Sequence, residues 1–201
     1  HPHNVTSSPM CSFLNVPLLI VLYISVLFVA KLQKCRNKVT SKLILHKFTN
    51  MIDQHPFYMK IALKEARKAL LDDEVPVGSI IVYNNKVIAK SHNRCIRLCD
   101  PTAHAEMQVI TSACNYLKSR YLQECILYTT LEPCNMCSGA LFWSKIGQLV
   151  YGAKDSKRGF SNFTESTLHP KTIITAGILA EECGYLLTQF FEKKRKLNIK
   201  N

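Results

Sequence analysis

The feature of this sequence that most constrains its fold is a set of three residues with the chemistry and spacing of metal ligands. His104 stands in the triplet HAE, and Cys134 and Cys137 follow about thirty residues later in the run PCNMC. Cysteines at positions i and i+3 share one face of a helix, and a helix N-terminus favours their thiolates. Zinc binds imidazole nitrogen and thiolate sulfur in a tetrahedral array. A fold that holds one zinc ion here must bring the histidine and both cysteines together.

Glu106 is the candidate for a proton-transferring group beside this metal. It lies two residues beyond His104, about 200° round a helix of 3.6 residues per turn, which places it poorly as a fourth ligand. Three protein ligands leave a position of zinc open to water, whose pKa the metal lowers towards roughly 7. We expect Glu106 to carry that proton to the substrate. The alternative is a closed structural zinc site completed by Cys95 or Cys99.

The hydrophobic pattern after residue 51 predicts alternating helices and strands. Apolar residues at helical spacing predict helices over 59–70, from an N-cap at Asp100 to residue 117, from Pro133 to residue 141, and over 178–197. Short β-rich runs predict strands over 79–83, 86–90, 125–130 and 148–151, the first two joined as a hairpin through Asn84 and Asn85. This alternation is typical of an α/β fold in which helices cover the faces of a sheet.

Residues 1–50 differ in composition from the rest and are predicted to lie outside a single domain of residues 51–201. They hold six basic residues and no acidic one, and residues 13–30 form an apolar stretch just long enough to span a bilayer. The basic residues follow that stretch, which favours a membrane anchor over a cleaved signal peptide. A third interpretation is translation from upstream of the true start, because Met51 opens the segment of different composition.

Cysteine usage and charge limit the compartment and the partners. Nine cysteines form an odd set spread over 201 residues, unlike the framework of a small secreted domain, so we expect a reducing compartment, the cytoplasm. The net charge of +12 favours a polyanionic partner such as nucleic acid or an anionic membrane surface. The basic run 193–196 is either part of such a binding surface or a solvated helix face.

Several motifs together resemble the bacterial tRNA-specific adenosine deaminases, a family of zinc-dependent nucleoside and nucleobase deaminases with an H-x-E and P-C-x-x-C signature. The resemblance covers about 145 residues and rests on EVPVG (74–78), HNR (92–94), DPTAHAEM (100–107), TTLEPCNMCSGAL (129–141), YGAKDSKRG (151–159), GILAEEC (177–183) and FFEKKRK (190–196). It implies a three-layer α/β/α cytidine-deaminase-like fold with a mixed central sheet of about five strands. It also implies a homodimer with one Zn²⁺ per subunit that converts the wobble adenosine of a tRNA anticodon stem-loop, of the bacterial tRNA-Arg type, to inosine.

The resemblance also implies roles for individual residues. His104, Cys134 and Cys137 would bind zinc, and Glu106 would be the proton shuttle. Seven further residues would meet the substrate. Asn93 would hydrogen-bond the target base with Val75 packed beside it, and Leu131 and Glu132 would border the anticodon pocket. Asp155 and Lys157 would meet the RNA backbone, and Phe191 with the basic residues after it would lie against the RNA. Residues 160–175 form a shorter stretch than in the best-known members, and residues 1–50 have no counterpart there.

Three other functions fit parts of the same pattern. A free nucleobase deaminase acting on guanine or cytosine would share the zinc signature. A catalytically inactive partner of a heterodimeric editing enzyme would be expected to lack the shuttle residue, and the intact Glu106 argues against it. An interaction module that binds metal only for structure would need no carboxylate at that position.

Overall fold

The computed structural model describes residues 54–163 and 167–198 of the chain, so the predictions for residues 1–50 lie outside the described residues. Residues 54–71 are helical. Three further helices and five strands follow, together with a short 3-10 turn at Phe160–Asn162 (η1). The strands are β1 (Gly78–Tyr83), β2 (Lys86–His92), β3 (Cys125–Leu131), β4 (Gln148–Ala153) and β5 (Ile173–Ala176), and the helices are α2 (Ala105–Leu117), α3 (Asn135–Ser144) and α4 (Ala180–Asn198).

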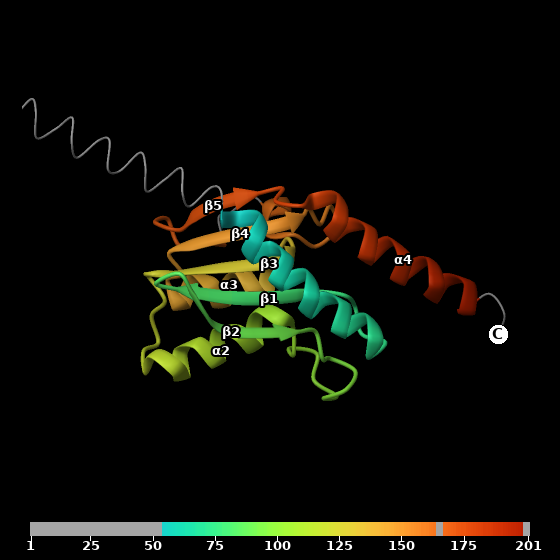
Figure 1. The fold of residues 1–201 in the computed structure, drawn as a ribbon, viewed down its shortest axis with the longest axis horizontal. Coiled ribbons are helices and arrows are strands. Elements are labelled where there is room, and N and C mark those ends of the chain that lie inside the picture. The colour runs from blue at the N-terminus through green and yellow to red at the C-terminus, as the bar shows by residue number, and fades with distance from the viewer. Residues whose placement is uncertain (1–53, 164–166, 199–201) are drawn as a thin grey trace, which may run out of the picture. The chain divides into compact units, whose positions relative to one another are not determined.

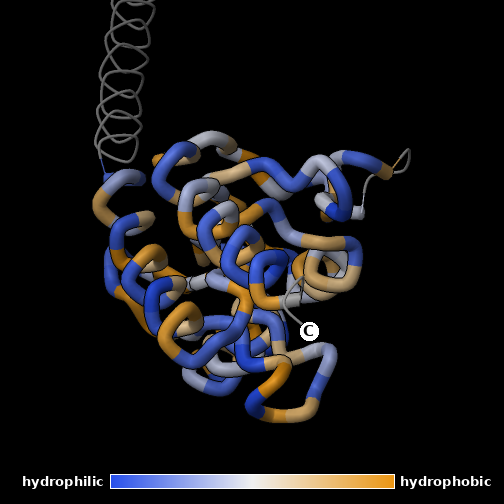
Figure 2. The backbone as a smooth tube through the Cα atoms, turned by 90° about the vertical axis from the view of Figure 1, so that its right-hand side faces the viewer, coloured by the Kyte–Doolittle hydropathy of each residue, from blue (hydrophilic) through white to orange (hydrophobic). Residues whose placement is uncertain are grey.

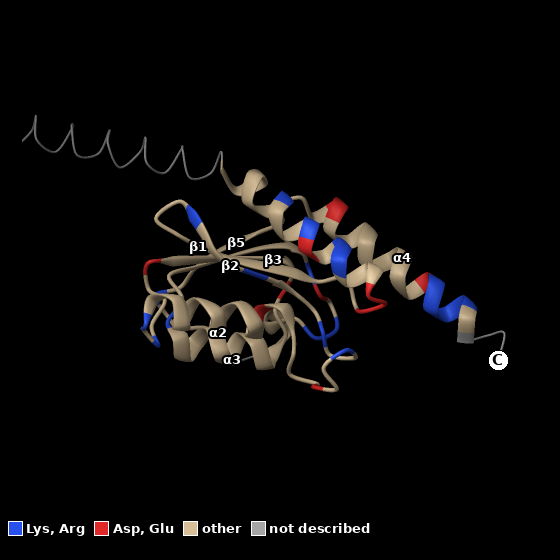
Figure 3. Ribbon diagram, turned by 60° about the horizontal axis from the view of Figure 1, so that its bottom comes forward, with Lys and Arg blue, Asp and Glu red and all other residues tan. Residues whose placement is uncertain are grey.

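The five strands form one mixed sheet in the order β2-β1-β3-β4-β5. β1 pairs antiparallel with both β2 and β3, whereas β3, β4 and β5 run parallel. Helices α2 and α3 lie on one face of the sheet, and α4 and the helix of residues 54–71 lie on the other (Figures 1 and 3). This arrangement confirms the three-layer α/β/α fold with a mixed central sheet.

The alternation of side chains along the strands divides the core in two. Ile81 of β1 and Leu127 of β3 are fully buried against α2 and α3, while their neighbours Ile80 and Tyr128 are buried under the helices of the other face. Successive side chains of a strand point to opposite faces, so a strand covered on both faces is apolar at most positions. The buried hydroxyls of Ser79 and Thr129 are exceptions, and they hydrogen-bond to each other. In Figure 2 hydrophobic (orange) and hydrophilic (blue) segments alternate along the backbone.

The predicted hairpin is confirmed at its turn. Asn84 and Asn85 both have positive φ, 48° and 59°, and they join β1 to β2. Asparagine tolerates this left-handed conformation, which matches the twist of the two strands in a two-residue turn.

The structure corrects the predicted helix starts and adds a strand. The first helix, predicted from residue 59, is already helical at residue 54, and α4, predicted from residue 178, begins at Ala180. Helix α2 begins at Ala105, because Asp100 Oδ1 accepts hydrogen bonds from the backbone N–H and the hydroxyl of Thr102 and forms a separate turn. Helix α3 begins at Asn135, two residues after Pro133. Strand β5 has only four residues and no buried face, so periodicity could not predict it. Its place in the sheet comes from parallel pairing with β4.

Within residues 54–163 and 167–198, the helices are too short or too polar to cross a membrane.

A close approach of the first described helix to β1 at Gly78 generates a stability prediction. A Cβ atom on Gly78 of β1 would overlap the backbone of Ala62 and Ala66, and backbone atoms cannot move aside as a flexible side chain can. We expect Gly78→Ala to lower the free energy of unfolding by about 3 kcal/mol, measured by urea denaturation of the full chain. Gly139→Ala is the matched control, because Gly139 lies within α3 with nothing near the added methyl group. It should raise stability by about 0.5–1 kcal/mol, the helix preference for alanine.

Candidate active site

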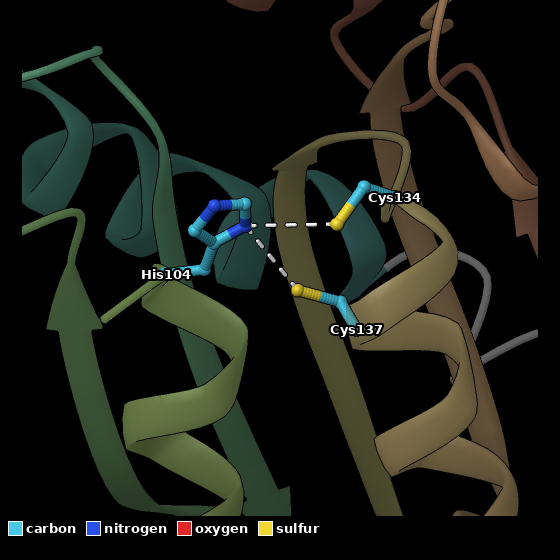
Figure 4. Close-up of side chains that lie close together, drawn as sticks. All are labelled: His104, Cys134 and Cys137. Atoms are coloured by element: carbon cyan, nitrogen blue, oxygen red, sulfur yellow. Dashed lines mark hydrogen bonds between the residues drawn. The ribbon is translucent and has the colours of Figure 1, made fainter. Parts of the chain in front are cut away.

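The structure brings the three predicted metal ligands together at one point between α2 and α3. His104 Nδ1 lies 3.7 Å from Cys134 Sγ and 3.5 Å from Cys137 Sγ. All three ligand atoms lie within 4.8 Å of one another, and Figure 4 shows the imidazole facing both sulfur atoms.

The local backbone explains why these side chains are available. His104 and Cys134 are the N-cap residues of α2 and α3, each with extended backbone, and neither side chain caps its own helix. Cys137 follows in the first turn of α3 and is fully buried. Two helix N-termini therefore converge on the cluster, and their unsatisfied N–H dipoles favour negative charge there.

The protons of the cluster are shared between its members. The pKa of Cys134 is lowered to about 4. The main cause is the hydrogen bond from the Cys137 thiol, and the bond to His104 lowers it further. The same Cys134 thiolate raises the pKa of Cys137, and its hydrogen bond to the imidazole raises the pKa of His104. One sulfur is therefore already a thiolate near neutral pH, which is the form that a metal binds.

The geometry of the cluster fits zinc. Bond lengths of about 2.0–2.1 Å to nitrogen and about 2.3 Å to sulfur give a tetrahedral N···S edge of about 3.6 Å. The two observed distances, 3.5 and 3.7 Å, lie on either side of that value. Among the described residues, neither Cys95 nor Cys99 belongs to the cluster. Their thiols donate to the oxygens of Asn93, Pro101 and Ile96 instead. The described chain thus supplies three ligands and leaves one position open, as in a catalytic zinc site.

Glu106 lies beside the cluster without being one of its ligands. It is 3% exposed, and its Oε2 atom has no hydrogen-bond partner in the part of the chain that the structure describes. Burial raises the pKa of this carboxyl to about 7. A group with such a pKa gains and loses a proton readily at neutral pH, which is the property that a proton shuttle requires.

Asn93 and Val75 lie on the His104 side of the cluster. Asn93 is buried, and its side-chain amide donates to Glu74 Oε2 at 3.2 Å. The amide of Gln108 on α2 donates to the backbone oxygens of His92 and Ala103, so the strand end that carries Asn93 is tied to the start of α2. Val75 is half-buried and directly follows Glu74.

Leu131, Glu132, Asp155 and Lys157 lie on the Cys134 side. Leu131 ends β3 and is half-buried, and Lys157 is exposed. The side chain of Asp155 accepts hydrogen bonds from the backbone N–H groups of Lys157 and Arg158, which shapes a tight turn. Glu132 is fully buried, and its carboxylate oxygens accept bonds from backbone N–H groups of the same loop.

Phe191 lies on α4, apart from the metal cluster, and its side chain is 45% exposed. The same helix carries the basic run towards its C-terminal end, visible as blue bands in Figure 3. Lys194 donates to Asp73 at 2.6 Å, which ties α4 to the loop that leads to Val75. This ion pair links the C-terminal half of the helix to the His104 side of the site, while Cys183 and Leu186 near its start pack in the core with Leu131 and Ala153.

Comparison with known proteins identifies the family. Residues 52–153 match the family described as the cytidine and deoxycytidylate deaminase zinc-binding region. The chain belongs to this deaminase family. It is 45% identical over 144 residues to a tRNA-specific adenosine deaminase of Aquifex aeolicus, a match that covers 69% of the chain and 95% of that protein. A similarly named protein of Bacillus subtilis is 42% identical over 148 residues, covering 71% of the chain and 92% of that protein.

A solved structure shares the fold of this deaminase. It comes from a study of A-to-I editing by tRNA:A34 deaminases at the wobble position of transfer RNA, and it has a TM-score of 0.62 and 41% identity. The match covers 65% of the chain and 99% of that structure.

Sequence reasoning missed two residues that shape the site of this deaminase. Glu74 lies in the EVPVG motif, but only the structure shows its carboxylate bonded to Asn93 and to the backbone N–H of Arg97. Gln108 has no sequence signal of this kind, because its role depends on three segments meeting in space.

The three-ligand geometry predicts the metal content of the deaminase. Purified protein should hold about one zinc ion per chain, and we expect Cys137→Ala to reduce this to near zero because two ligands bind zinc far more weakly than three. Cys114→Ala is the matched control, since Cys114 is a half-buried free cysteine of α2 outside the cluster. Elemental analysis measures both. Full zinc content in Cys137→Ala would contradict the assignment.

Proposed function

We propose that this enzyme deaminates the wobble adenosine of a tRNA anticodon, replacing its amino group with oxygen from water to give inosine. The observation that carries the proposal is the buried carboxyl of Glu106 beside the His104, Cys134 and Cys137 cluster. The names of the relatives from Aquifex aeolicus and Bacillus subtilis support tRNA as the substrate.

The residues of the chain account for the proton transfers of the reaction. Bound zinc would activate a water molecule for addition to C6 of adenine. Glu106 accepts the proton that this water releases and delivers a proton to ring N1. It then takes the remaining proton of the hydroxyl group added at C6 and passes it to the amino group. The C6–N bond breaks, so one water is consumed, ammonia leaves and C6 becomes the carbonyl of inosine. The raised pKa of Glu106, about 7, suits a group that must act in both directions.

The anticodon stem-loop is the part of tRNA that suits this site. Bases of a single-stranded loop are already partly splayed, which reduces the cost of moving one into an enclosed pocket. In this proposal Asn93 and Val75 contact the base, Leu131 lines the pocket, and Lys157 meets the backbone. The exposed basic end of α4 supplies attraction to phosphate groups, and Phe191 offers an exposed ring for contact with the RNA.

We further propose a homodimer of subunits in which residues 51–201 form the deaminase domain. Tyr116 on α2 and Trp143 on α3 are 64% and 77% exposed. Large apolar side chains on one layer of the fold support a protein contact there. Light scattering of the purified protein tests the dimer, with a monomer mass as the contrary result.

The free thiols of the seven described cysteines agree with a cytoplasmic protein.

The proposed function predicts inosine formation that depends on Glu106. The full chain should deaminate an anticodon stem-loop with a wobble adenosine. Glu106→Gln keeps the side-chain shape but cannot carry the proton, so its kcat should fall by about 10³-fold or more. Inosine is measured by nucleoside mass spectrometry, with free guanine and cytosine as parallel substrates. Turnover of a free base without inosine formation would reject tRNA in favour of a nucleobase deaminase.

The ion pair of Lys194 generates a prediction about tRNA binding. Lys194 is engaged with Asp73 and lies over the ring of Phe190, whereas Lys193, Arg195 and Lys196 have no ion pair among the described residues. Replacing those three together by alanine should weaken binding and reduce the slope of log K against log salt by about 2 to 3. Lys194→Ala should change this slope by less than the removal of any one of those three charges does, because Lys194 is already paired with Asp73. Equal slopes for the triple variant and the wild type would exclude α4 from the RNA contact.

A further inference from the structure

A buried glutamate joins the end of β3 to the loop of residues 154–161 on the Cys134 side of the site. Glu132 is 1% exposed. Its Oε2 accepts the backbone N–H of Asp155 at 3.0 Å, and its Oε1 accepts the backbone N–H of Ser161 at 2.9 Å. One carboxylate thus holds both ends of the loop.

The charge of this carboxylate is balanced by backbone dipoles. Among the described residues, no lysine, arginine or histidine forms an ion pair with Glu132. A buried carboxylate is costly unless its oxygens are hydrogen-bonded, and bonds from N–H groups to an ionised acceptor are strong. The carboxylate of Glu132 therefore keeps its hydrogen bonds only while the loop is in place. The loop in turn is held only while that carboxylate accepts its two N–H groups.

The same loop touches the metal site through its backbone. Gly159 forms an isolated β-bridge with Cys134, and the N–H of Phe160 donates to the carbonyl of Pro133 at 2.9 Å. Gly159 is buried against the Glu132 carboxylate, and a Cβ atom there would overlap it. Only glycine leaves room for the carboxylate between the two segments.

We infer that Glu132 is a positioning residue that clamps the loop of residues 154–161 against the segment carrying the ligand Cys134. Both of its oxygens bind the loop, and its side chain is enclosed, so it is not a surface contact for RNA. The clamp presents the exposed side chains of Lys157 and Arg158 at one side of the site. That these side chains meet RNA rests on the proposed function, whereas the clamp itself does not.

Limited trypsin digestion of the full chain tests the clamp directly, because Lys154, Lys157 and Arg158 are exposed cleavage sites within the loop. Glu132→Gln keeps the size of the side chain but turns an amide group towards one of the two backbone N–H groups. The rate of cleavage after these residues should rise at least about tenfold, because proteolysis follows the population of the opened loop. Cleavage after Lys118, exposed at the end of α2, is the internal reference and should not change.

Two further variants complete the test. Gly159→Ala should release the loop as Glu132→Gln does, because its methyl group displaces the carboxylate from the other side. Glu65→Gln is the matched control, since Glu65 is a buried glutamate of the first described helix bonded to Lys68, and it should leave loop cleavage unchanged. Unchanged loop cleavage in both Glu132→Gln and Gly159→Ala would overturn the inference. Equal acceleration at the loop and at Lys118 would also overturn it, because Glu132 would then support the whole domain.

The kinetics of the variant separate this inference from the proposed function. If the wild type forms inosine, Glu132→Gln should raise KM for the stem-loop at least about tenfold, since Lys157 is no longer held in place. An unchanged KM would overturn the role of the clamp in substrate binding. If the wild type forms no inosine while the variant loop is released, the proposed function falls and the clamp stands.

Discussion

The site depends on two helices that begin at the same point in space. His104 and Cys134 are both N-cap residues, so each ligand lies where a chain segment leaves an extended conformation and enters a helix. The sheet holds these two starts together, because β3 leads into α3 while α2 packs on β1 and β2. The converging helix dipoles favour thiolate at the cluster. Glu106, one residue inside α2, is consequently buried beside the ligands and has the neutral-range pKa that proton transfer needs.

Two buried glutamates support the site from opposite sides. Glu74 binds the Asn93 amide and the backbone of Arg97, and Glu132 binds the backbone at both ends of the loop 154–161. In both cases each carboxylate oxygen has its own donor. Neither glutamate has an ion-pair partner among the described residues, so both depend on the loops that they hold. Loops on a rigid scaffold commonly carry binding residues, and these carboxylates make the two loops part of that scaffold.

The basic end of α4 serves two purposes that the sequence does not separate. Lys194 forms an internal ion pair with Asp73, and its ammonium lies 5.5 Å from the centre of the Phe190 ring. Lys193, Arg195 and Lys196 leave their charges available to a polyanion. One cation of the run therefore fixes the helix to the loop before Val75, while the others give that side of the molecule its positive surface.

Much of this protein follows from local sequence. The strands of the hairpin, the amphipathic helices and the ligand set were predictable, because each depends on side-chain periodicity, turn chemistry or metal-ligand spacing within short segments. The start of α2 was not, since Asp100 bonds to Thr102 in preference to capping a helix. Strand β5 and the roles of Glu74 and Glu132 also required the structure. Each depends on hydrogen bonds between segments distant in sequence, and only tertiary packing decides which donors a buried carboxylate or an edge strand meets.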